Sequence, residues 1–180
     1  GRTLLALSVL SLLPTFLVQG HGFAPGAAGS VTGSVALASI VGSVCYGTFA
    51  NRISDKIIAT SAAIVLIVSA FLAFADAAVP FQVVTFAAMA VLMSGILVAQ
   101  TFAAVPRVAR TPLLIGPTNG LVAQLGSVGA LTGPPIIGTL ITSAGWSVVP
   151  FVVAAFTLSF VGLFVLALHS QNTSLSKDAT

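Results

Sequence analysis

The chain alternates between long apolar stretches and short polar turns. Six stretches, between 17 and 30 residues long, are almost wholly apolar: residues 3–19, 28–50, 57–75, 81–104, 114–143 and 147–169. A helix needs about 20 mainly apolar residues to cross the hydrocarbon of a bilayer. Each stretch ends at a turn that contains glycine, proline or charged residues. The pattern therefore predicts six transmembrane helices.

β-Strands do not fit this pattern. The runs are too long, and they lack the alternation of apolar and polar residues that an outer-membrane barrel shows. Backbone exposed to lipid must form its hydrogen bonds within its own element, so helices remain. The predicted fold class is all-α, an integral membrane six-helix bundle over residues 1–170. We expect the polar tail, residues 171–180, to be disordered and cytoplasmic.

The composition supports a membrane location. Charged residues make up 5% of the 180 positions and hydrophobic residues 57%. A soluble globule carries charge at about a quarter of its positions. The lipid bilayer is therefore the first expected partner. The net charge of +3 comes from few, scattered residues, so nothing indicates binding to nucleic acid.

All basic residues fall on one side of the predicted topology. They are Arg2, Arg52, Lys56, Arg107, Arg110 and Lys177. The three loops on the opposite side contain no Lys or Arg. The positive-inside rule makes the basic side cytoplasmic. We therefore expect both termini in the cytoplasm, and the protein in the inner (plasma) membrane of a bacterium.

Glycine is concentrated in the second and fifth spans. These glycines are Gly29, Gly33, Gly42 and Gly47, then Gly116, Gly120, Gly126, Gly129, Gly133 and Gly138. Small residues four positions apart let helices approach closely. Spans two and five are equivalent if the bundle consists of two inverted three-helix repeats. We predict these repeats, with glycine faces that serve either packing alone or sliding during a conformational change.

The loop after the second span carries a motif. It runs from Gly47 to Lys56 as GTFANRISDK, and it resembles the loop motif G-x-x-x-D-R/K-x-G-R-R/K of the major facilitator superfamily. Gly47, Arg52 and Lys56 match, whereas Asn51 replaces an acid and Asp55 replaces a basic residue. The degraded form resembles the copy in the C-terminal half of that family. Such a loop latches helices in one conformation, here with Asp55 paired to Arg52 or Lys56, unless its charges only set the topology.

The fifth span carries a second pattern, which is similar to the glycine- and proline-rich helix of the same superfamily. Its residues are Gly120, Gly129, Gly133, Pro134 and Gly138. The resemblance covers the whole chain. It implies the C-terminal half of a secondary transporter that moves a small solute by alternating access. The partner would be an N-terminal six-helix half, in the same polypeptide or as a second copy.

In that family the first, second, fourth and fifth helices line the solute cavity. The polar side chains that we single out on these spans are Gln124, Asn119, Gln100 and Thr15, which become the candidate solute-binding residues. Gln124 lies about ten residues into its span, or about 15 Å from the cytoplasmic end, close to the midplane. Amides buried in membranes also bond to neighbouring helices, so a structural role is the alternative for each.

The chain has few residues of the types that form catalytic sites. Its two His and one Cys stand apart, and its three acids lie in loops or in the tail. A nucleophile, base and acid cannot be assembled from them, nor can a cluster of metal ligands. We expect no enzyme, no cofactor and no metal. The alternative to a transporter half is a non-transport six-helix scaffold or assembly subunit.

Overall fold

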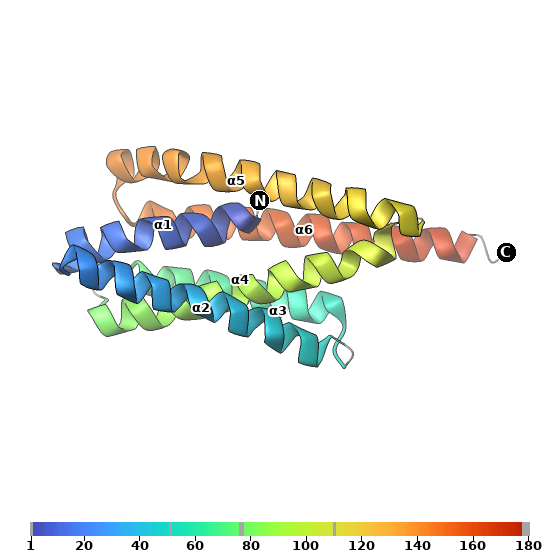
Figure 1. Ribbon diagram of the computed structural model, residues 1–180, viewed down its shortest axis with the longest axis horizontal. Coiled ribbons are helices and arrows are strands. Elements are labelled where there is room, and N and C mark those ends of the chain that lie inside the picture. Colours follow the sequence, from blue (N-terminus) through green and yellow to red (C-terminus); the bar gives the residue numbers. More distant parts are fainter. Residues whose placement is uncertain (1, 51, 76–77, 110, 178–180) are drawn as a thin grey trace.

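The computed structural model describes residues 2–50, 52–75, 78–109 and 111–177. Over these ranges the chain forms six long α-helices and one short 3-10 helix, and no strand (Figure 1). The elements are α1 (Arg2–His21), α2 (Pro25–Phe49), α3 (Asp55–Ala73), α4 (Pro80–Val108), η1 (Pro112–Leu114), α5 (Ile115–Ala144) and α6 (Val148–Lys177). The predicted all-α helical bundle is confirmed.

Proline and glycine set several of the helix ends. Pro25 and Pro80 occupy the first positions of α2 and α4, where a missing N–H costs no hydrogen bond. Gly22 and Gly145 follow α1 and α5 with positive φ angles, which glycine adopts without strain. Among the described residues, four helical segments are long and apolar enough to cross a membrane: Pro25–Phe49, Asp55–Ala73, Pro80–Arg107 and Pro112–Ala144.

Two helices extend beyond their predicted ends. Helix α4 continues to Val108, about one turn past residue 104, and so carries Arg107. Helix α6 continues to Lys177, so residues 171–177 of the expected disordered tail are helical, and 178–180 lie outside the described residues. The sequence from residue 163 onward contains no Gly or Pro to stop the helix.

Two of the main helix contacts are equivalent under the predicted division into two three-helix units. Helix α2 packs along α4, and α5 packs along α1. If the first unit (α1–α3) is superposed on the second (α4–α6), α1 corresponds to α4 and α2 to α5. The contact between α2 and α4 is therefore equivalent to the contact between α5 and α1. The largest fully buried side chains come mainly from α1, α4 and α6: Leu13, Leu17, Val83, Val91, Gln100, Ile137, Val149, Val153 and Thr157.

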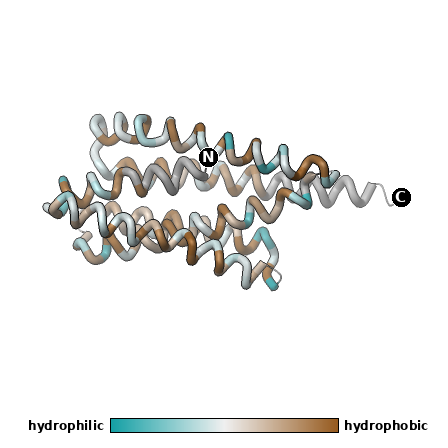
Figure 2. Tube along the Cα trace, viewed as in Figure 1, coloured by the Kyte–Doolittle hydropathy of each residue, from teal (hydrophilic) through white to brown (hydrophobic). Residues whose placement is uncertain are grey.

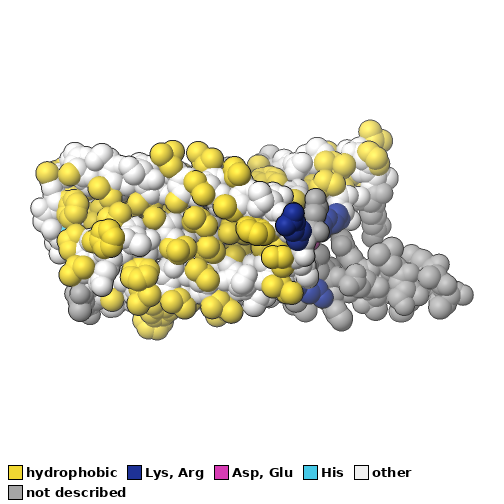
Figure 3. Space-filling model, turned by 90° about the horizontal axis from the view of Figure 1, so that it is seen from below, with side chains coloured by type: hydrophobic (Ala, Val, Ile, Leu, Met, Phe, Trp, Pro, Cys, Tyr) yellow, Lys and Arg dark blue, Asp and Glu magenta, His cyan; other side chains and the backbone are white. Residues whose placement is uncertain are grey.

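The outer surface is apolar along most of its length. Hydrophobic residues run along all the helices whose hydropathy is drawn (Figure 2). Large exposed side chains such as Leu37, Phe81 and Leu131 remain uncovered by the bundle. On the face in Figure 3, hydrophobic side chains cover the body and Lys and Arg gather at one end. Such a surface suits hydrocarbon bounded by one basic interface.

Helices α2 and α4 cross in direct backbone contact. A Cβ atom added to Gly42 would collide with the carbonyl oxygen of Leu92, and one added to Gly95 would collide with that of Ser39. The hydroxyl of Ser43 lies 3.0 Å from the Ser39 carbonyl oxygen of its own helix and 3.2 Å from the Gly95 carbonyl oxygen across the crossing, so the two acceptors share its one proton. Small residues give helices in lipid this close approach. The sequence indicated Gly42, but Gly95 stands alone in its span and was missed.

We expect Gly42→Ala and Gly95→Ala each to lower the free energy of unfolding by roughly 1–3 kcal/mol, because the added methyl group must push the two backbones apart. The measurement is unfolding of the purified chain by titration with SDS, followed by circular dichroism. Gly33→Ala is the matched control, since its Cβ would meet nothing within 4 Å. A control variant as unstable as the other two would contradict this account.

Candidate functional site

The described charged side chains meet at the end of the bundle where α2 turns into α3. The turn closes when the backbone N–H groups of Arg52 and Ile53 donate to the Phe49 carbonyl, at 2.9 and 3.1 Å. Asp55 then begins α3, where the positive end of the helix dipole favours a carboxylate. The turn therefore fixes the position of the Asp55 side chain.

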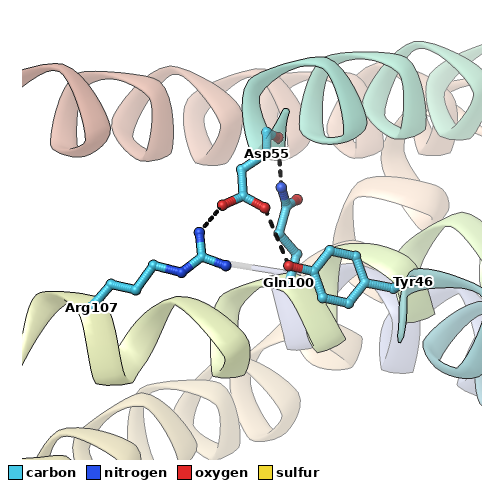
Figure 4. Close-up of polar contacts among 4 residues, drawn as sticks. All are labelled: Tyr46, Asp55, Gln100 and Arg107. Carbon is cyan, nitrogen blue, oxygen red and sulfur yellow. Dashed lines mark hydrogen bonds and ion pairs between the residues drawn. The ribbon is translucent and has the colours of Figure 1, made fainter. Parts of the chain in front are cut away.

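Three side chains from two other helices converge on Asp55 (Figure 4). Arg107 of α4 forms an ion pair with its Oδ2 atom. The Tyr46 hydroxyl of α2 donates to Oδ1 at 3.2 Å. Gln100 of α4 donates from Nε2 to the Asp55 backbone carbonyl at 2.6 Å. We call these four residues the loop cluster, and it ties the ends of α2, α3 and α4 together.

The partner of Asp55 differs from the prediction. The sequence favoured Arg52 or Lys56, but Arg107 makes the ion pair. The extra turn of α4 carries Arg107 to the start of α3. Arg52 is exposed and Lys56 half-buried beside the cluster. Sequence reasoning also missed Tyr46, although the chain contains no other tyrosine and it stands nine positions before Asp55.

The remaining residues of the predicted loop motif contribute less to this geometry. Gly47 is exposed, and a Cβ there would meet nothing within 4 Å. Asn51 lies outside the described residues. Gln100, a candidate cavity residue, is only 1% exposed and lies inside the loop cluster. Its amide therefore joins α4 to α3 in this structure.

The other candidate solute-binding residues lie on α1 and α5. Gln124 and Thr15 are exposed and Asn119 is half-buried. The Asn119 Oδ1 atom is itself buried, and no described residue donates a hydrogen bond to it. Asn119 and Gln124 are five positions apart, which places them about 140° apart around the helix. They therefore occupy different faces of α5.

The glycine- and proline-rich pattern of α5 also divides by face. Gly129 and Gly133 are buried and Pro134 is half-buried. At Gly120 and Gly138 an added Cβ would meet nothing within 4 Å. Buried glycines serve packing inside the bundle, while at the other two no described residue of another element lies close. Among the described residues no group of three or more His, Cys, Asp or Glu is placed to hold a metal ion.

The chain is similar to a known protein family. The family model described as Major Facilitator Superfamily matches residues 3–179, nearly the full length of the chain. No curated protein and no solved structure matches it.

A double-mutant cycle tests the ion pair. We expect Asp55→Asn and Arg107→Gln to show a coupling of about 0.5–1 kcal/mol in the free energy of unfolding, because the arginine side chain is 53% exposed and water screens the pair. The same cycle with Arg52→Gln in place of Arg107→Gln should show no coupling. Equal coupling in both cycles would mean that Asp55 responds to general positive charge rather than to Arg107.

Proposed function

Because the chain belongs to the Major Facilitator Superfamily, we propose that it is the C-terminal six-helix half of a secondary transporter. In this proposal a small solute moves through a cavity between this bundle and an N-terminal half, by alternating access. The observation that carries the proposal is the pair of small-residue helix faces on α2 and α5 that the described part of the bundle leaves uncovered. The family match supports transport over the alternative, a non-transport scaffold or assembly subunit.

The uncovered faces suit close contact with a second set of helices. At Gly29 and Gly33 of α2, and at Gly116 and Gly120 of α5, an added Cβ would meet nothing within 4 Å. Each pair has the spacing that permits helices in lipid to approach closely. Lipid alone gives no reason for such spacing on two equivalent helices. A partner half, in the same polypeptide or as a second copy, accounts for both faces.

The polar groups of α5 are our candidates for solute contact. Gln124 follows Gly116 and Gly120 at four-residue intervals, so it lies on the same open face. Asn119 offers a buried oxygen to which no described residue donates, and such an atom is costly unless something donates to it. A solute, a water molecule or a side chain of the partner half would supply that donor.

The loop cluster is our candidate for a conformational latch. An Asp55–Arg107 pair that is partly exposed contributes little to stability. It can therefore break and form again at small cost while α3 and α4 change their relative position. This proposal keeps the role predicted for the loop, with Arg107 as the partner.

Transport tests the solute-binding proposal. We expect Gln124→Ala and Asn119→Ala to lower solute uptake by the complete transporter at least about tenfold, because a lost hydrogen bond to a substrate costs about 1.4 kcal/mol or more. The measurement is uptake into proteoliposomes across a panel of small solutes. Ser159→Ala is the control, since that exposed hydroxyl on α6 donates to its own helix at Ala155.

Normal uptake by both α5 variants would remove these residues from the binding site. Uptake of no solute by a folded, complete protein, across the panel, would favour the scaffold alternative.

Membrane sidedness is a separate prediction. In a Cys45→Ala background, we expect cysteines introduced at Ser54 and Thr111 to react with an impermeant maleimide from the cytoplasmic side. A cysteine at Ala24 should react from the opposite side. All three positions are exposed, and the basic loops should face the cytoplasm of a bacterial inner membrane. Labelling of Ser54→Cys and Thr111→Cys from opposite sides would refute the topology.

A further inference from the structure

An apolar groove opens on the outside of the bundle next to the loop cluster. It has a volume of about 290 Å³ and lies between α2, α3 and α4. Its lining includes Phe49 of α2, Ile57 and Val65 of α3, and Met93 and Ile96 of α4. Phe49 is 50% exposed and Ile57 62%. The groove is therefore open to whatever surrounds the bundle.

The groove gives a polar ligand little to bind. Its hydroxyl groups belong to Tyr46 and Ser61. Tyr46 already donates to Asp55, and Ser61 donates to the carbonyl oxygen of Ile58 in its own helix. The rest of the lining is hydrocarbon apart from the thioether of Met93. The chemistry therefore selects an apolar occupant.

The length of the groove matches half a bilayer. Along α3 it extends from Ile57 to Val65, a rise of about 12 Å at 1.5 Å per residue. Along α4, Met93 lies about 21 Å from Arg107 by the same measure. Half of the hydrocarbon core is about 15 Å thick. An acyl chain that enters at the basic end would thus lie along the groove as far as the midplane.

Basic residues stand next to lining residues of the entrance in the sequence. Arg52 and Lys56 flank Ile53 and Ile57, which line the groove, and Arg107 lies beside them in the loop cluster. Asp55 is the one acid between residues 1 and 75, so three cations face one carboxylate. Figure 3 shows Lys and Arg side chains beside hydrophobic ones at one end of the molecule. An anionic headgroup complements this entrance.

We propose that this groove binds one acyl chain of an anionic phospholipid, whose phosphate lies against Arg52 and Lys56. The site does not depend on the transported solute. It predicts a preference for anionic over zwitterionic lipid at one place on the surface of the bundle.

Fluorescence quenching by brominated lipids tests this site. The intact chain, carrying Trp146→Phe and Phe49→Trp, is placed in phosphatidylcholine bilayers that contain a small fraction of brominated phosphatidylglycerol or brominated phosphatidylcholine. We expect the anionic lipid to quench at least about threefold more strongly at equal mole fraction, because each basic residue adds to its local concentration. In the Arg52→Gln/Lys56→Gln variant the ratio should fall to about one.

Two controls separate the site from general surface charge. Leu163→Trp in the same background places the probe on α6, at a side chain that is 70% exposed and outside the groove; there the ratio should be close to one. Raising the salt concentration should remove the preference at Phe49→Trp without any change to the basic residues, which keeps the test valid if the double variant fails to fold.

Equal quenching by both lipids at Phe49→Trp would overturn the proposal, and so would a preference that survives both charge neutralisation and high salt. The same preference at Leu163→Trp would show general attraction to the basic end of the bundle and would also overturn it. Absence of quenching by either lipid would mean that protein covers the groove, which is equally incompatible with a lipid site.

Discussion

The absence of water from the hydrocarbon is the constraint on which this structure depends, because each polar group within the bilayer must find its partner inside the protein. Most hydroxyl groups do so locally. Thr32, Thr85 and Thr132 each donate to the carbonyl four positions earlier in their own helix. Helix–helix contact is therefore left to apolar side chains and to backbone approach at glycine. Among the described residues, side-chain hydrogen bonds between helices lie at the α2–α4 crossing and in the loop cluster.

This constraint explains which parts of the structure the sequence could predict. Helix positions follow from local runs of apolar residues and from proline and glycine at their ends, so the bundle and most boundaries were predicted to within a few residues. The partners of Asp55 could not be predicted in this way. Arg107 is 52 positions away and Gln100 is 45, and their contact depends on how α3 and α4 pack. Gln100 was therefore assigned to a cavity although it lies in the loop cluster.

Glycine shows the same limit. By their four-residue spacing, Gly29 and Gly33 would be predicted to pack against another helix, yet no described atom lies near an added Cβ at either position. The isolated Gly95, in contrast, lies against the backbone of Ser39. A glycine's role is decided by the atoms opposite its missing Cβ, and those belong to another helix. Of the two interpretations left open by the sequence, packing applies to Gly42, whereas a sliding face stays a prediction for the open glycines.

The loop cluster and the apolar groove share structural parts, and this links them mechanically. Tyr46 donates to Asp55 and also lines the groove. Helix α4 supplies Arg107 to the cluster and Met93 and Ile96 to the groove wall. A shift of α4 relative to α3 would therefore break the ion pair and reshape the groove in one movement. A ligand of the groove that binds one of these two arrangements more tightly would stabilise that arrangement by the difference in binding free energy. Conversely, formation of the ion pair would change the binding free energy of that ligand by the same amount.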